Sequence, residues 1–193
     1  MKKIMFSDKY CLTLAVLYGI KTMTRRLLKE GTPLGNWEET AKCLPYKVGD
    51  IVAIAQPYKD IIESMAEYSD IIINVDGSIN REYKAGWTNK MFVKADLMPH
   101  HIRITDVKIE HLQDISDKEC LREGVKRASI GFYAEGVKVK DWEKEAHRET
   151  ASGCLKLFPF PRPAFASLID KISGKGTWES NPWVVTYSFE LVD

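Results

Sequence analysis

The C-terminal segment NPWVVTYSFELV has the most regular alternation of apolar and polar residues in the chain. Apolar side chains occupy every second position from Val185 to Leu191, and Thr186, Ser188 and Glu190 lie between them. A period of two residues is typical of a strand with one buried face. The preceding Asn-Pro pair supplies a turn, so the sequence is expected to end in a well-defined β-strand.

Three further segments have strand features: residues 2–6, the apolar run Ile51–Ala55, and residues 102–109. Isolated helices are expected at residues 8–18, at 116–124, and after the proline-containing run 159–163. Ser116 and Glu119 have the spacing of a capping box for the second of these helices. Strands and helices in this irregular order indicate an α+β fold, a small β-barrel with flanking helices.

The length of 193 residues and the hydrophobic content of 45% suit one domain with a sizeable core. We therefore expect a single domain over residues 1–193. Segments at about 27–45, 59–90 and 126–160 are rich in turn residues or lack clear periodicity, and we interpret them as insertions. The first is expected to be a long loop, and the second to contain a hairpin around Asp76-Gly77.

The formal net charge of +1 argues against a protein that binds polyanions over its whole surface. The four cysteines are more than thirty residues apart and form no CxxC pair, which argues against a zinc site or a disulfide framework. No stretch approaches the eighteen apolar residues of a membrane span. These features predict a cytoplasmic protein with reduced thiols and no membrane association.

The stretch GIKTMTRR, residues 19–26, concentrates positive charge directly after an apolar helix. One interpretation is structural, because cations at a helix C-terminus gain roughly 0.3–1 kcal/mol from the helix dipole. The other is functional and needs a turn led by Gly19 that brings Lys21 close to Thr24. A desolvated lysine beside a hydroxyl can act as a base, and Arg25 and Arg26 offer forked donors for a phosphate or an oxyanion.

Glu123 lies in the last turn of the expected short helix. It can be an ordinary surface glutamate. However, the helix dipole disfavours a carboxylate at that end, so a glutamate held there is a candidate for proton transfer.

A second candidate site lies in the segment GWTNKMFVKADLMPHHIRI. Trp87 can stack on a planar base, Asn89 can donate and accept amide hydrogen bonds, and His100 lies on the same segment. The alternative is that Trp87 and Met98 are core residues and the histidines are exposed. Adjacent histidines point apart on a strand, so no metal pair is expected there.

The sequence contains no Walker loop, no GxGxxG, no GxSxG and no paired Cys-His motif. These absences argue against P-loop nucleotide hydrolysis, dinucleotide redox chemistry and serine-hydrolase chemistry. No cofactor and no metal are expected.

The pattern Gly19-x-Lys21-x-x-x-x-Arg26 resembles the GxKxxxxR signature of the ASCH domain, a member of the PUA-like β-barrel superfamily. The segments YKVGDIVAIAQ, IRITDVKIEHLQDISDKECLREGV and NPWVVTYSFELV follow in the order expected for that family. The arrangement is similar to the larger ASCH proteins of bacteriophages and gut bacteria. The resemblance implies a PUA-like barrel and a partner that is RNA or a modified nucleoside.

Some small ASCH proteins are amidohydrolases that deacetylate N(4)-acetylcytidine. The resemblance places Lys21, Thr24 and Glu123 at their catalytic positions, with Lys21 as base, Thr24 as nucleophile and Glu123 as proton relay or orienting group. Arg26 would hold an oxyanion or a substrate oxygen. This chain is nearly twice as long as those small enzymes, and fold and site can be reused for binding alone.

Three functions remain open at this point. The first is a nucleoside- or RNA-binding protein that hydrolyses an N-acyl group. The second is a non-catalytic RNA-binding module in which Arg25, Arg26 and Lys29 contact phosphates and Trp87 stacks on a base. The third is a phage-derived interaction protein with a relic cleft. The sequence does not give the oligomeric state or the natural substrate.

Overall fold

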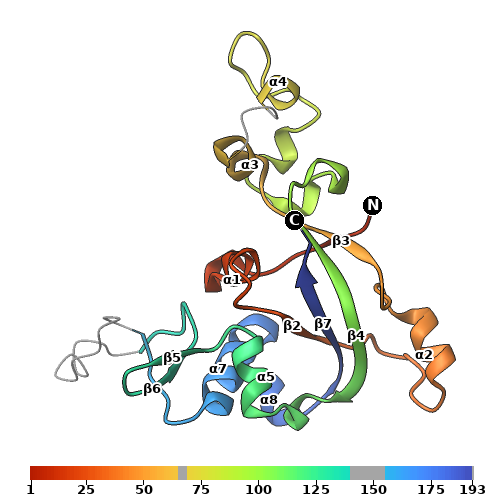
Figure 1. Cartoon of the computed structure of the whole chain (residues 1–193), viewed down its shortest axis with the longest axis vertical. Coiled ribbons are helices and arrows are strands. Elements are labelled where there is room, and N and C mark those ends of the chain that lie inside the picture. Colours follow the sequence, from red (N-terminus) through yellow and green to blue (C-terminus); the bar gives the residue numbers. More distant parts are fainter. Residues whose placement is uncertain (65–68, 140–154, 193) are drawn as a thin grey trace. The chain divides into compact units, whose positions relative to one another are not determined.

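The computed structural model describes residues 1–64, 69–139 and 155–192, which fall into two compact units (Figure 1). The first unit contains Met1–Phe6, Asp50–Arg103 and Leu191–Asp193. The second contains Ser7–Gly49 and Ile104–Glu190. Each unit is built from segments that are far apart in the sequence.

The main sheet has five strands in the order β1-β3-β4-β7-β2. In the first unit, β1 (Lys3–Ile4) pairs in parallel with β3 (Ile51–Ile54), and β3 pairs antiparallel with residues 101–103 at the start of β4 (His101–His111), whose remaining residues belong to the second unit. In the second unit, β2 (Met23–Leu27) pairs antiparallel with β7 (Trp183–Leu191). The expected strands at 51–55 and at the C-terminus are confirmed.

The sheet does not close into the predicted barrel. In the part of the chain that the structure describes, β1 and β2 are at opposite ends of the strand order and are not paired with each other. The architecture is therefore a mixed α/β arrangement around an open, mixed sheet.

The first unit is mainly helical outside its strands. Its elements are α3 (Tyr58–Ser64), α4 (Ser69–Ile72) and the 3₁₀ turns Lys84–Gly86, Lys90–Phe92 and Ala95–Leu97. They cover a core that includes Tyr58, Ile61, Ile72 and Met98. The expected hairpin around Asp76-Gly77 is reduced to a turn closed by a single bridge between Ile73 and Ile79.

The second unit carries the other helices of the described residues. They are a 3₁₀ turn at Asp8–Tyr10, α1 (Leu12–Leu17), α2 (Trp37–Cys43), a 3₁₀ turn at Leu112–Asp114, α5 (Asp117–Arg122), α7 (Pro161–Ser173) and α8 (Thr177–Ser180). A small hairpin joins β5 (Lys126–Ala128) to β6 (Gly131–Tyr133). Figure 1 shows α5, α7 and α8 gathered together, and their apolar faces share one core cluster.

Two expectations about the second unit were wrong in detail. The helix expected at 8–18 is interrupted at Cys11, which adopts a left-handed conformation with φ of 51°. The segment 27–45 is not only a loop, because α2 forms where the Asn36 side chain accepts a hydrogen bond from Glu38 N at 2.9 Å. An asparagine N-cap satisfies one of the unpaired donors of the first turn and so starts a helix.

Candidate functional site

The signature segment leaves α1 through a tight turn and enters the sheet as β2. Gly19 has a φ of 67°, and the backbone N–H groups of Ile20 and Lys21 both donate to Ala15 O at 2.8 Å. A glycine reaches this left-handed conformation without steric cost. Lys21 is therefore fixed at the point where the helix has ended and β2 is about to begin.

Lys21 and Glu123 form a buried ion pair. Lys21 Nζ donates to Glu123 Oε2 at 2.6 Å and to the Glu123 backbone carbonyl at 2.8 Å. The two side chains are only 2% and 5% exposed. A lysine and a glutamate with so little contact with water must balance each other's charge, since an isolated buried ion is very costly.

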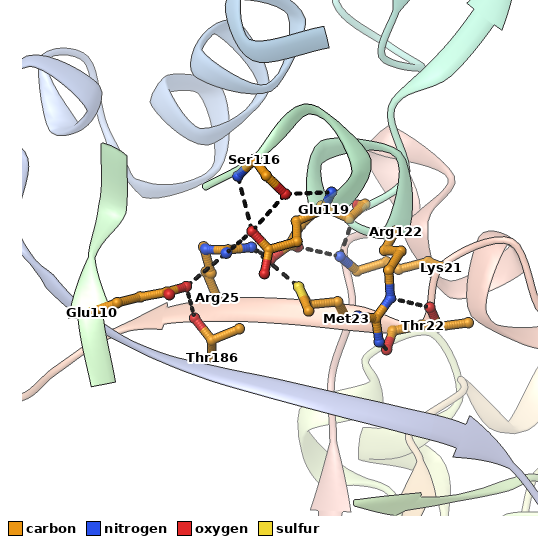
Figure 2. A network of polar contacts seen from close by, with 10 residues as sticks. Lys21, Thr22, Met23, Arg25, Glu110, Ser116, Glu119, Arg122 and Thr186 are labelled. Atoms are coloured by element: carbon orange, nitrogen blue, oxygen red, sulfur yellow. Dashed lines mark hydrogen bonds and ion pairs between the residues drawn. The ribbon is translucent and has the colours of Figure 1, made fainter. Parts of the chain in front are cut away.

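Arg25 extends this pair into a larger network (Figure 2). Its guanidinium lies 2.6 Å from a Glu110 oxygen, 3.2 Å from Glu119 and 3.3 Å from Glu123. Thr186 Oγ1 also donates to Glu110, at 2.8 Å. Two cations thus lie among three carboxylates at the junction of β2, β4, β7 and α5.

The sequence of α5 explains how two of these carboxylates reach the network. Ser116 Oγ and Glu119 form the predicted capping box, which starts the helix and places the Glu119 carboxylate near Arg25. Glu123 is the C-cap, followed by Gly124 with a φ of 103°. A short helix stopped by a glycine therefore presents a glutamate from each end.

Arg122 ties the same helix to the signature segment. Its Nε donates to Thr22 Oγ1 at 3.1 Å, and Thr22 N donates to the Arg122 carbonyl at 3.0 Å. These hydrogen bonds hold the end of α5 beside the start of β2, as Figure 2 shows.

The surroundings of the network shift two pKa values. Burial lowers the pKa of Lys21 from its ordinary value, the Glu123 carboxylate opposes this, and the charges of Arg26 and Arg25 add to the lowering. For Glu119, burial acts to raise the pKa, but hydrogen bonds from Ser116 and the charge of Arg25 together hold it below its usual value. Perturbed groups of this kind gather at functional sites as well as in structural ion networks.

Thr24 and Arg26 lie on the other face of β2. Successive residues of a strand point to opposite faces, and Arg25 shares its face with Met23 and with its cross-strand partner Thr186. Thr24 is opposite Tyr187, whose ring packs edge-on against Tyr46 with centroids 5.3 Å apart. Burial raises the pKa of Tyr46 and of Tyr187, and the nearby Arg26 charge opposes both shifts.

The predicted catalytic residues are thus brought together only in part. Lys21 meets Glu123, but Thr24 lies within a strand and not in the turn that we expected to bring it to Lys21. Its side chain is 6% exposed and has no hydrogen bond to Lys21 or Glu123 among the described residues. The pairing of β2 with β7 is the reason, because it extends the backbone from Met23 onward.

The other predicted binding residues, Trp87, Asn89 and His100, belong to the first unit. Trp87 is partly buried against the core of that unit. Asn89 is exposed and caps a 3₁₀ turn by accepting a hydrogen bond from Met91 N at 3.0 Å. The His100 carbonyl accepts from Ile54 N at 2.8 Å. Capping and core packing therefore account for the first two of these side chains.

Glu110 and Glu119 were not predicted as site residues. Glu119 was identified only as a helix-capping residue, and Glu110 was not singled out. No sequence signal marks them, because the burial of Lys21 and Arg25, which requires more than one carboxylate in return, is set by the tertiary structure.

Residues 1–64, 69–139 and 155–192 contain no group of three histidine, cysteine or acidic side chains placed to hold a metal ion. Cys154 and His147 lie outside these residues. No helix within the same ranges has both the length and the apolar character that crossing a membrane requires.

No protein-family model and no curated protein matches the chain. Two solved structures are similar to it. One is an ASCH domain from Lactobacillus crispatus JV V101, with 16% identity, a TM-score of 0.37, and coverage of 96% of this chain and 75% of that one. The other is a DUF984 protein from Enterococcus faecalis V583, with 16% identity, a TM-score of 0.39, and coverage of 100% and 77%.

The first of these belongs to the family that the signature residues resemble. Both TM-scores lie below 0.5.

Proposed function

We propose that this protein binds a nucleoside or an RNA base beside the signature strand and hydrolyses an N-acyl group from a cytidine-type base. The observation that carries this proposal is the 2.6 Å contact between Lys21 Nζ and Glu123 Oε2, with both side chains at most 5% exposed. Replacing a buried ion pair by apolar residues is often neutral or stabilising. A lysine of lowered pKa in such a pair is therefore better explained by proton transfer than by stability alone.

The chemistry assigns one step to each residue. Lys21 passes its ammonium proton to Glu123. The Thr24 hydroxyl makes no hydrogen bond to Lys21 among the described residues, so the step requires Thr24 to move within reach of the Lys21 amine, which then takes the hydroxyl proton as the Thr24 oxygen attacks the acyl carbonyl. A C–O bond forms, the C–N bond breaks, and the leaving base amine receives a proton from Lys21. Water then cleaves the acyl-threonine ester, which releases the carboxylic acid and restores Thr24.

The direct test is incubation of the purified protein with N(4)-acetylcytidine, with cytidine release followed by chromatography. Lys21→Met, Thr24→Ala and Glu123→Gln should each reduce release by about 100-fold or more, the typical scale for loss of an acid–base or nucleophilic group. Glu179→Gln is the matched control, because Glu179 is an exposed glutamate of α8 outside the network.

Circular dichroism on each variant separates loss of chemistry from loss of fold. No cytidine release by the wild-type protein at micromolar concentration over several hours would reject hydrolysis of this substrate.

A second candidate is RNA binding without chemistry, and the position of Thr24 favours it. Thr24 lies on the face of β2 opposite Arg25 and has no hydrogen bond to Lys21 in the part of the chain described. In this case the buried network only holds β2 in place and takes no part in chemistry, and Arg26 contacts a phosphate. Binding of RNA oligonucleotides should then weaken as salt rises. Arg26→Gln should make the slope of log binding constant against log salt concentration shallower, by the amount expected for about one lost phosphate contact.

A protein that neither releases cytidine nor binds RNA in a salt-dependent way would fit the remaining alternative, an interaction protein with a relic site.

A further inference from the structure

A second concentration of positive charge lies in the second unit, on the small hairpin and the strand-like segment beside it. Five cations occur among the described residues of 126–138 and 155–162, and the one acidic residue there is Glu135. The cations are Lys126, Arg127, Lys138, Lys156 and Arg162. Because the whole chain has a net charge of only +1, this local excess is balanced by acidic residues elsewhere.

The backbone brings two of these cations, Arg127 and Lys156, to one face although they come from distant segments. Phe132 in β6 exchanges two hydrogen bonds with Phe158, each of 2.8 Å. The segment around Phe158 therefore pairs with β6 and extends the hairpin to three neighbouring segments. Arg127 is opposite Phe132 in the β5–β6 register. Arg127, Phe132 and Phe158 therefore share one face of this small sheet, and Lys156, two residues before Phe158, lies on that face as well.

Three of the cations lie over aromatic rings. Arg127 Cζ is 5.5 Å from the centroid of Phe132, and Lys156 Nζ is 5.0 Å from that of Phe158. The third pair is Arg162 with Trp178, at 6.0 Å. Phe132, Phe158 and Trp178 are all partly buried against the same hydrophobic cluster, so the rings are held firmly while the charged groups above them stay exposed.

Four of these five cations have no acidic partner among the described residues. Lys126 forms an ion pair with Glu135 at 2.9 Å, whereas the other four make no ion pair within the residues that the structure describes. A ring beneath a cation restricts its side chain without neutralising its charge. Such preorganised charge loses little conformational entropy when it meets an anion.

We propose that this surface, formed by β5, β6 and residues 155–162, binds single-stranded nucleic acid, with Arg127, Lys156 and Arg162 contacting phosphates and Phe160 stacking on a base. Phe160 is 63% exposed and lies two residues from Arg162. Alternating cations and aromatic rings are the features that single-strand binding requires, because the phosphates need charge and the bases need flat apolar partners. An acidic peptide would use the cations but not the rings.

The surface shares no residue with the Lys21 site, so its test is separate from that of the proposed function. The probe is a fluorescein-labelled twelve-nucleotide oligo-U RNA, with binding followed by fluorescence anisotropy at several salt concentrations. The test variant is Arg127→Gln/Lys156→Gln. The matched control is Lys118→Gln/Lys175→Gln, which removes two exposed charges of the same unit from outside β5, β6 and residues 155–162.

The test variant should bind the RNA more weakly than the control does. Its slope of log binding constant against log salt concentration should be shallower by about 0.7 for each phosphate that is no longer neutralised. Phe160→Ala should weaken binding about five-fold or more while leaving that slope unchanged.

Equal binding by the test and control variants would overturn the proposal. If Arg26→Gln alone abolished RNA binding, the Lys21 site would be the RNA site and this surface would not. Binding of poly-glutamate as tight as that of the RNA, unaffected by Phe160→Ala, would overturn it in favour of an acidic protein partner.

Discussion

Lys21 and Glu123 are 102 positions apart in the sequence, yet Lys21 Nζ lies 2.6 Å from the Glu123 carboxylate and 2.8 Å from the Glu123 backbone carbonyl. The same glutamate accepts from Arg25 at 3.3 Å. The end of α5 is thus joined to the signature segment by charge as well as by packing. Any change to one partner leaves the others buried without their balance of charge.

Removing Lys21 alone should therefore destabilise the protein more than removing the pair. We expect Lys21→Met to cost about 3 kcal/mol, the lower end of the range for breaking a buried pair, because Arg25 still compensates Glu123. Adding Glu123→Gln should recover much of this loss, since the glutamine carries no charge to be left unpaired. Chemical denaturation of the single and double variants measures both effects, and a double variant less stable than Lys21→Met would contradict the explanation.

The thiol of Cys120 should contribute to a loss of stability in alkali. Burial raises the pKa of Cys120 from 9.0 to about 12, so the folded state holds its proton more tightly than the unfolded state does. Its contribution is fully present below about pH 9 and is lost as the pH rises towards 12. Unfolding followed between pH 8 and 11 should therefore show a shallower decline for Cys120→Ala than for the wild type. Cys43→Ala is the control, because Cys43 is exposed.

The same cysteines should differ in their reactivity with iodoacetamide. The thiolate is the reactive form, and Cys120 is fully buried with a raised pKa. We expect mass spectrometry to find Cys43 modified in the native protein and Cys120 modified only after denaturation. Modification of Cys120 at the rate of Cys43 under native conditions would show that α5 opens readily.

Gly131 should be essential to the hairpin that carries the proposed nucleic-acid surface. Its φ is 101°, and a Cβ built there would lie 2.4 Å from the Phe158 carbonyl oxygen. Gly131→Ala should cost about 1–3 kcal/mol through strained backbone, and should separate the 155–158 segment from β6. Hydrogen exchange at the Phe132 and Phe158 amides reports this directly. Gly35→Ala, which meets nothing within 4 Å and needs no positive φ, should leave those amides unchanged.

Loss of the capping box should weaken α5 and loosen the buried network. Ser116 Oγ accepts from Glu119 N at 3.3 Å and donates to the Glu119 carboxylate at 3.0 Å. Ser116→Ala should cost about 1 kcal/mol, the usual value for an N-cap. Ser129→Ala, at an exposed position in the β5–β6 turn, should change stability by less than about 0.5 kcal/mol. Equal effects of the two substitutions would show that the cap contributes nothing.

Local patterns in the sequence determined several elements of this protein. The alternation in Trp183–Leu191, the apolar run at Ile51–Ile54, the capping box at Ser116 and the glycine stop at Gly124 each gave a correct element. Each depends on neighbouring residues, because backbone conformation, side-chain periodicity and capping act over a few positions. Lys21 and Glu123 were also identified as candidate residues, although their contact was not visible in the sequence.

Tertiary structure decided what those patterns left open. The pairing of β2 with β7 extended the signature segment and placed Thr24 on the face opposite Arg25, where a local turn had been expected. The position of α5 brought Glu119 and Glu123 to Arg25, and β4 brought Glu110. A charge that is buried where distant segments pack together must be balanced by an opposite charge on one of those segments. That partner depends on strand order and helix position, which no local stretch of sequence specifies.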